Sequence, residues 1–188
     1  MSDKSDLQLV NEFQNGNIGA FNELVRRYQQ KVYWIARRMV GNHDDADDVV
    51  QEVFVKVHKN LNRFRSESTF YTWLYRIATN MSINAIRKKK VVEWLRFDDA
   101  LPAMSVVSDE SQDPSKKIEL QENRAMLSKA IAGLPAKQKQ VFIFRYYDEL
   151  PYEEISKIMK TSVGGLKANY FHAVKNIQKY FKDNGDDL

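Results

Sequence analysis

The stretch FRSESTFYTWLYRIATNMSINAIRKKK, residues 64–90, begins polar, becomes aromatic and ends in four consecutive cations. Placed on a helix from Tyr71 to about Lys90, its side chains separate into two stripes. The apolar stripe consists of Phe70, Trp73, Leu74, Ile77 and Met81. The other stripe is polar, with Arg76, Asn80, Asn84 and Arg87 at steps of four, four and three. The stretch therefore predicts one long helix that packs in a core along one side and offers amides and cations along the other.

Helical periodicity continues toward the N-terminus. Apolar residues at three- and four-residue steps predict a helix that includes Phe21, Leu24, Val25, Tyr28, Val32, Ile35 and Met39. Gly41-Asn42 is expected to end it, and HDDADD to begin the next, because carboxylates suit the positive end of a helix dipole. The apolar stripe of that next helix comprises Ala46, Val49, Val50, Val53, Val57 and Leu61. No segment shows sustained strand alternation, so the first half is predicted to be a small helical bundle.

Toward the C-terminus the periodicity stops and then returns. Residues 97–117 lack it and are rich in Asp, Ser and Pro, which is typical of a mobile linker. From Ile118 four shorter helices are predicted, with Pro135 and Pro151 in first turns. The last two form a helix-turn-helix, in which Ser162 can cap the second helix. The predicted fold class is all-α, with two small helical domains at residues 1–95 and 118–188 joined by a flexible acidic linker at 96–117.

Composition narrows the classes of function. The 188-residue chain has no cysteine, which excludes disulfides, zinc-thiolate sites and cysteine nucleophiles. It has no apolar run suited to a secretory signal or a membrane span, so we expect a soluble, cytoplasmic protein without direct membrane insertion. Residues 1–96 carry 16 Lys or Arg against 11 Asp or Glu, and residues 116–188 carry 13 against 9. Residues 97–115 carry five acids and no cation, so two basic ends flank an acidic middle, a pattern that hints at a polyanionic partner.

The second helix of the helix-turn-helix has one face that suits DNA. Its buried stripe is predicted to be Leu166, Tyr170, Ala173, Ile177 and Phe181. From Ser162 to Lys182 there are four lysines and no acid. Opposite the buried stripe, Asn169 could offer a bidentate amide to adenine while the lysines meet phosphates. The alternative is an ordinary amphipathic helix with a solvated lysine face. The polar stripe from Arg76 to Arg87 could likewise be a solvated helix face that binds nothing.

Taken together, three stretches resemble the extracytoplasmic-function group of bacterial sigma factors, the promoter-recognition subunits of RNA polymerase. The stretches are DADDVVQEVFVKVHKNLNRFR, STFYTWLYRIATNMSINAIRKKK and LPAKQKQVFIFRYYDELPYEEISKIMKTSVGGLKANYFHAVKNI. They cover most of the chain in the family's order, with a variable linker where the family has one. The resemblance implies the minimal form of the family, with region 2 at residues 1–95, region 4 at residues 118–188, and a non-catalytic role in transcription initiation.

The resemblance implies that region 2 binds both RNA polymerase core and the minus-ten promoter element. The part that docks on the clamp helices of the polymerase matches Asp44, Asp48, Gln51, Glu52 and Val55. The loop that captures a base flipped from the minus-ten element matches Arg65, Ser66, Glu67 and Ser68. The helix that melts and holds the strand implies further contacts from Tyr75, Arg76, Asn80, Asn84, Arg87 and Lys88. Its cationic end is expected to meet the DNA backbone, with a salt-sensitive contribution to affinity.

The resemblance implies that region 4 reads the minus-thirty-five element and contacts the polymerase flap. The implied DNA contacts are Gly165, Lys167, Ala168, Asn169, His172, Lys175 and Asn176. Family members typically place Gly-Thr-Val before a Ser-Arg pair, with another arginine three residues further on. This chain instead has Gly164-Gly165-Leu166, then Ala168-Asn169, then His172. Loss of two guanidiniums removes strong guanine contacts, so we expect a different or weaker minus-thirty-five preference.

An anti-sigma factor is a further possible partner, and a regulator that acts without polymerase is a further possible function. Many relatives are held inactive by an anti-sigma factor, often membrane-associated, although nothing in this sequence identifies one. No cofactor or metal is expected. One alternative function is a polymerase-independent DNA-binding regulator, which would bind duplex tightly by itself.

An enzyme is the other alternative. His43-Asp44 superficially resembles a metal-dependent phosphohydrolase dyad, but only His58 and His172 remain as further histidines. DDADDVVQE lacks the central glycine of an EF-hand loop, and no Walker loop or Gly-x-Ser-x-Gly motif is present. Intrinsic catalysis is therefore not expected.

Overall fold

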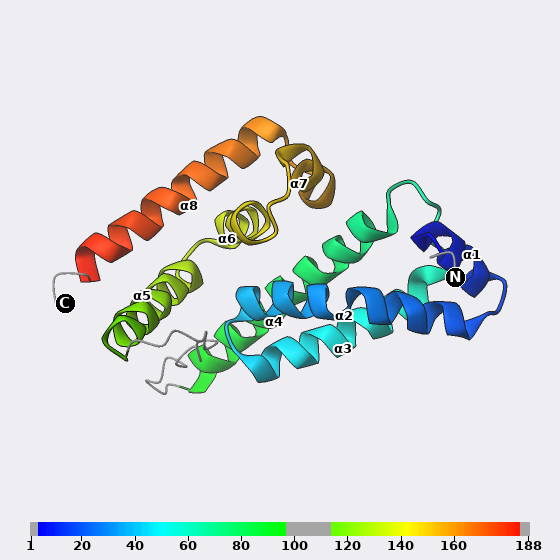
Figure 1. Cartoon of the computed structure of the whole chain (residues 1–188), viewed down its shortest axis with the longest axis horizontal. Helices are drawn as coiled ribbons and strands as arrows, with labels where there is room; N and C mark the ends of the chain where they lie inside the picture. Colours follow the sequence, from blue (N-terminus) through cyan, green and yellow to red (C-terminus); the bar gives the residue numbers. More distant parts are fainter. Residues whose placement is uncertain (1–3, 97–113, 185–188) are drawn as a thin grey trace.

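The computed structural model describes the backbone of residues 4–96 and 114–184 and, within them, the side chains of residues 4–89 and 123–184. Two groups of helices, one from each half of the chain, lie against each other (Figure 1). The described residues contain no strand, which confirms the predicted all-α fold with two helical domains. Residues 97–113 of the expected linker lie outside the described residues, and the domain boundaries stay predictions.

The helices of the first group are α1 Asp6–Gln14, α2 Ile18–Val40, α3 His43–Leu61 and α4 Phe70–Arg96. The second group comprises α5 Pro114–Ala132, α6 Ala136–Phe142, the π-helical turn η1 Ile143–Tyr147, α7 Tyr152–Met159 and α8 Val163–Asn184. Within the described parts of both groups, no helix is long and apolar enough to cross a membrane.

Side-chain caps and one glycine fix the helix ends of the first group. The hydroxyl of Ser5 accepts a hydrogen bond from the backbone N–H of Gln8, whose side chain accepts one from the Ser5 N–H at 2.8 Å. Gly41 ends α2 with φ of 97°, a left-handed conformation that favours glycine. Asn42 then caps α3 by accepting from the Asp45 N–H at 2.8 Å. The prediction that Gly41-Asn42 separates two helices is confirmed.

The core of the first group lies where α1, α2, α3 and α4 meet. Leu24 and Val32 from α2 and Val53 from α3 are fully buried, and Leu74 from α4 completes the same cluster. Trp73, by contrast, is only partly buried and packs against the edge of this cluster, where it contacts the ring of Phe64. The aromatic half of the opening stretch thus anchors α4 in the bundle, as its apolar stripe predicted.

The second group contains the predicted helix-turn-helix, formed by α7 and α8. Lys160 turns the chain with φ of 51°, and the Ser162 hydroxyl accepts from the Gly165 N–H at 3.3 Å, as expected of a cap. Leu166, Ala173 and Ile177 are buried as predicted. The helix that was predicted to begin near Pro135 passes after Phe142 into the π-helical turn η1, which the sequence did not predict.

An apolar cluster joins the two groups. From the first group it takes Ile35 and Met39 of α2 and Tyr75 of α4, all at most 3% exposed. The second group contributes Val141, Ile143, Phe144, Ile155, Ile158 and Leu166. We call these nine residues the interdomain cluster. Because their surfaces are removed from water, the hydrophobic effect stabilises the closed arrangement as it does each group's own core.

Polar contacts border the interdomain cluster. The Arg38 guanidinium on α2 donates to the Asp148 carboxylate at 2.9 Å and lies 4.4 Å from the centre of the Tyr147 ring. The buried Lys139 ammonium donates to the backbone carbonyl of Met39 at 3.1 Å. An ion pair and a cation–π contact on one guanidinium orient the two groups more narrowly than apolar packing alone.

Candidate functional site: three exposed surfaces

The first surface is the acidic face of α3. The N-terminal turn of α3 places carboxylates at the positive end of the helix dipole, and apolar residues on the opposite side pack it onto α2 and α4. All five residues expected to dock on polymerase are exposed there: Asp44, Asp48, Gln51, Glu52 and Val55. Val55 is 53% exposed, an unusual position for an apolar side chain among carboxylates. The face combines negative charge with one apolar contact point.

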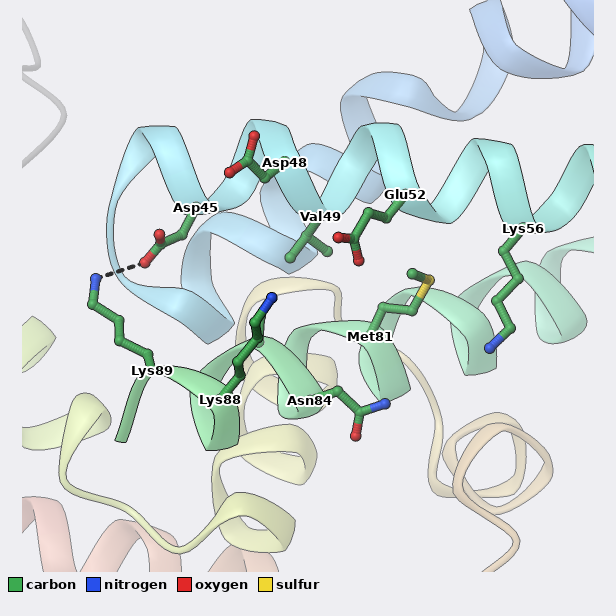
Figure 2. Close-up of a pocket in the computed structure, with 10 residues that line it drawn as sticks. Asp45, Asp48, Val49, Glu52, Lys56, Met81, Asn84, Lys88 and Lys89 are labelled. Atoms are coloured by element: carbon green, nitrogen blue, oxygen red, sulfur yellow. Dashed lines mark hydrogen bonds and ion pairs between the residues drawn. The ribbon is translucent and has the colours of Figure 1, made fainter. Parts of the chain in front are cut away.

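A groove between α3 and α4 adjoins the acidic face (Figure 2). Asp48 and Glu52 line it from α3, and Asn84 and Lys88 line it from α4. At one end the Lys89 ammonium bonds the Asp45 carboxylate at 2.7 Å. Acids and cations that lie far apart in the sequence thus share one groove.

The Asp45–Lys89 pair changes the electrostatics of that groove. Partial burial would raise the pKa of Asp45, but hydrogen bonds from Lys89 and Asn42 outweigh it and hold this pKa below its usual value. The sequence predicted DNA contacts for the cationic end of α4 and did not predict this pair. The sequence shows acids on one predicted helix and cations on the next. It does not show which carboxylate of α3 lies opposite which lysine of α4.

The second surface is the loop before α4, at residues 65–68, with the exposed side of α4. Arg65, Ser66 and Glu67 are exposed, and Ser66 has a φ of 56°, in the left-handed region that is uncommon for residues other than glycine. A pocket beside the loop is lined by Ser66, Glu67, Ser68, Tyr71 and Arg76 together with Glu154 and Lys157 of α7. The second half of the chain therefore forms one wall of the pocket expected to receive a flipped base.

The expected DNA contacts on α4 fall into two sets. The exposed set consists of Asn80, Asn84, Arg87 and Lys88. The covered set consists of Tyr75, which is 3% exposed and stacks on Phe144 with ring centres 6.1 Å apart, and Arg76. The Arg76 Nε–H donates to the backbone carbonyl of Lys157 at 3.0 Å. In this closed arrangement the two covered side chains contact α7 and η1 at the positions where DNA contacts were expected.

Burial also fixes the protonation of the tyrosines in this region. Desolvation raises the pKa of Tyr71 to about 12 and raises that of Tyr75 further. Their rings lie tilted against each other, with centres 4.0 Å apart. Both side chains are therefore neutral phenols.

The third surface is the outer face of α8. Lys167, Ala168, His172 and Lys175 are exposed, as expected of residues that meet DNA. The two amides have partners within the chain: Asn169 Nδ2 donates to the Gly165 carbonyl at 2.7 Å, and Asn176 Nδ2 donates to Gln138 at 2.9 Å.

Two further features of this face concern Gly165 and Phe171. Gly165 sits close to Thr161 and Ser162, which a Cβ at that position would approach at 3.3 Å. Phe171, which was not predicted as a site residue, is 63% exposed on this face. Its position opposite the buried stripe was the signal that could have found it.

The His43-Asp44 pair has ordinary neighbours. His43 Nδ1 lies 3.0 Å from the Tyr33 hydroxyl, and His43 Nε2 lies 3.5 Å from Asp47. Among the side chains of residues 4–89 and 123–184, no group of three potential metal ligands is brought together.

Comparisons with known proteins agree with the fold. The family model of sigma-70 region 2 matches residues 24–91, and that of sigma-70 region 4 matches residues 124–177. The chain is 32% identical to the ECF RNA polymerase sigma factor SigW of Bacillus subtilis (strain 168) over 178 residues, which cover 93% of this chain and 95% of SigW. It is 37% identical to the ECF RNA polymerase sigma-E factor of Escherichia coli (strain K12), with 90% of each chain covered.

Solved structures share the fold. CnrH in complex with the cytosolic domain of CnrY matches with a TM-score of 0.68 and 20% identity, over 96% of this chain and 99% of that one. The sigma factor RpoE of Bartonella quintana, solved with the anti-sigma factor NepR, matches with a TM-score of 0.65 and 22% identity, over 89% and 99%. With both family models in order and curated relatives aligned along nearly the whole length, the chain belongs to the extracytoplasmic-function family of bacterial RNA polymerase sigma factors.

Proposed function

We propose that this sigma factor docks on core RNA polymerase through the acidic face of α3 and directs initiation at its own set of promoters. The observation that carries the proposal is the exposure of all five expected docking residues on one helix face. Carboxylates there would meet a basic partner and set its orientation and association rate, while Val55 supplies apolar contact. This face is expected to bind the clamp helices of the polymerase. Region 4 is expected to bind the polymerase flap.

Promoter opening is proposed for the loop at residues 65–68 and for α4. The exposed loop and the pocket beside it suit a base extruded from the duplex, an extrusion that costs a few kcal/mol. Asn80, Asn84, Arg87 and Lys88 are available for the unpaired strand as the structure stands. Tyr75 and Arg76 are covered by the second half, so their use requires α7 and η1 to move away from α4.

Upstream recognition is proposed for α8. Its lysines would hold phosphates, and its outer face would enter the major groove of the minus-thirty-five element. The Asn169 amide donates to its own helix in this structure, so a bidentate contact with adenine would need another rotamer. That requirement supports the expected departure from the family's usual upstream preference.

The remaining roles follow from the polymerase partnership. Nucleotide polymerisation would belong to the core enzyme, so this chain would act as a non-catalytic subunit in the cytoplasm. The Bartonella quintana structure was solved with an anti-sigma factor. We infer that an anti-sigma factor is also a partner of this chain.

Co-purification and transcription with core polymerase test the proposal. The variant Asp48→Lys, Glu52→Lys should recover at least about tenfold less polymerase than the parent chain, because close charge pairs at interfaces couple by a few kcal/mol. The control Gln29→Lys, Gln30→Lys also introduces two lysines, at exposed positions on α2 that belong to none of the proposed binding surfaces, and should recover the normal amount.

Runoff transcription with purified core polymerase and promoter fragments then separates the alternatives. New start sites should appear with the parent chain and not with the α3 variant. Equal polymerase recovery by both double variants would remove the proposed docking face. If the parent chain neither binds core polymerase nor changes start sites, yet binds duplex tightly by itself, a polymerase-independent regulator is the better description.

A further inference from the structure

Phe171 lies in the middle of the solvent-facing line of α8. This line runs at steps of four, three and four through Gly164, Ala168, Phe171 and Lys175, all exposed. The buried line, with Leu166, is on the other side of the helix. At 63% exposed, the ring takes no part in the cores of either half, and its aromatic neighbour is the exposed His172, with ring centres 5.6 Å apart.

The first three residues of this line are apolar, and its last residue is a lysine. Gly164 and Ala168 present almost no side chain, and a Cβ at Gly164 would meet nothing within 4 Å. Phe171 therefore projects beyond its neighbours toward any surface that approaches α8. Lys167, Lys175 and Lys179 flank it, and no acid occurs from Ser162 to Lys182. A polyanion is the partner that this charge distribution fits.

The hydrogen-bonding groups that could read base edges here are few. Asn169 and Asn176 donate to Gly165 and Gln138, and the chain has no arginine on this helix. The major groove also carries one apolar marker, the C5-methyl group of thymine, which aromatic and methyl side chains contact. An exposed ring beside Ala168, inside a basic surround, has the chemistry to read that methyl group.

We propose that Phe171, with Ala168 beside it, is a specificity-determining residue that reads thymine methyl groups in the minus-thirty-five element. This inference rests on the proposed function, because it places α8 in the major groove of promoter DNA. It replaces the expected amide contact of Asn169 with apolar readout as the main source of base discrimination.

Thymine-to-deoxyuridine substitution tests the inference, because deoxyuridine keeps every hydrogen-bonding group and lacks only the methyl. Core polymerase with the full-length chain first selects a promoter duplex from a pool randomised upstream, and each upstream thymine of the selected duplex is then replaced in turn. The parent chain should lose about fourfold in affinity at one or two thymines, the effect of one methyl-sized group.

Matched variants connect that loss to Phe171. Phe171→Ala should bind the selected duplex more weakly by a similar factor and show no further loss at those thymines, and Phe171→Leu should retain part of the sensitivity. Lys179→Ala, a phosphate-contact control, should weaken every probe alike and keep the thymine dependence. Since Phe171 is exposed, these variants should fold normally.

Three outcomes would overturn the inference. The selected duplex could contain no upstream thymine, the parent chain could ignore every deoxyuridine, or Phe171→Ala could lose the same factor at the same thymines as the parent. Failure of the parent chain to form any promoter-specific complex with core polymerase is a different result, because it would overturn the proposed function and this inference with it.

Discussion

Asp148 is a single residue on which the contact between the two halves depends. Its carboxylate accepts from Arg38 through one oxygen, while the other oxygen is buried and lacks a hydrogen-bond partner within the described residues. The groups that face it are Arg38 from α2 and the phenols of Tyr71 and Tyr75 from α4, which stay neutral over the acidic range. Burial raises the pKa of Asp148 above 3.8, and the Arg38 charge only partly offsets this effect.

The raised pKa predicts a pH dependence of stability that is opposite to that of most carboxylates. Because the folded chain binds the Asp148 proton more tightly than the unfolded chain, this group makes the folded state more stable as pH falls through the folded pKa toward 3.8. The free energy of unfolding of the parent chain minus that of Asp148→Asn should therefore increase from pH 7 to pH 4 in urea titrations.

Asp45 and Glu23, whose pKa values are lowered, make the folded state less stable as pH falls. Because both proteins contain these two residues, their contribution cancels in the difference between the two free energies of unfolding. A difference that stays flat or decreases toward pH 4 would show that Asp148 does not hold a raised pKa.

The element α2 shows what the sequence could and could not predict. Its apolar stripe was correct from Leu24 to Met39, because a buried helix face repeats every three or four residues whatever covers it. Within that stripe, however, Leu24 and Val32 pack in the first group, while Ile35 and Met39 pack against the second. Periodicity indicates that a face is buried and carries no information on which distant element buries it.

Other elements have the same limit. The helix-turn-helix was predictable because its cap, turn and apolar steps are local. The π-helical turn η1 was not predicted, because apolar steps indicate that Ile143 and Phe144 are buried and carry no information on the hydrogen-bond spacing of the turn. The expected site residues on α3 and α8 were predicted at exposed positions, whereas burial of Tyr75 depends on a residue that is distant in the sequence.

The Asp45–Lys89 pair between α3 and α4 predicts unequal roles for neighbouring lysines. Lys88 is exposed, but Lys89 already bonds a carboxylate at 2.7 Å. Affinity for the promoter, measured for the chain with core polymerase, should fall less steeply with salt in Lys88→Ala. The slope of log affinity against log salt should become less negative by about 1 in this variant, and by less in Lys89→Ala. Binding titrations of both variants from low to moderate salt measure these slopes. Equal reductions would mean that the pair with Asp45 breaks when DNA binds.

At the scale of the whole molecule, closure competes with promoter contact. The interdomain cluster buries Tyr75, and the carbonyl of Lys157 holds Arg76, so both side chains are used to keep the halves together. The same residues are expected to contact DNA. Any event that engages them with promoter DNA must therefore first supply the free energy that separates α7 from α4.

Loss of the Arg38 contacts should open the free chain. Arg38→Ala removes the ion pair with Asp148 and the cation–π contact with Tyr147, so we expect the ratio of open to closed molecules to rise about tenfold. The absence of native cysteine allows fluorescent labels at Lys59→Cys on α3 and Gln178→Cys on α8, and single-molecule energy transfer between them reports the ratio.

Arg26→Ala is the matched control for that measurement. It removes an arginine from the same helix that pairs with Glu23 and is not part of the contact between the halves. Its energy-transfer distribution should equal that of the parent. Identical distributions for the Arg38 and Arg26 variants would show that the Arg38 contacts do not hold the two halves together.

The apolar cluster between the halves has a calorimetric consequence. Exposure of nonpolar surface raises heat capacity, whereas its burial at a new interface lowers it. If the chain opens as it joins polymerase, the heat-capacity increase from exposing the interdomain cluster cancels part of the decrease from burying surface against the polymerase. The assembly enthalpy of the parent chain should therefore depend less steeply on temperature than that of the Arg38→Ala variant, in which a larger share of the molecules is open before binding.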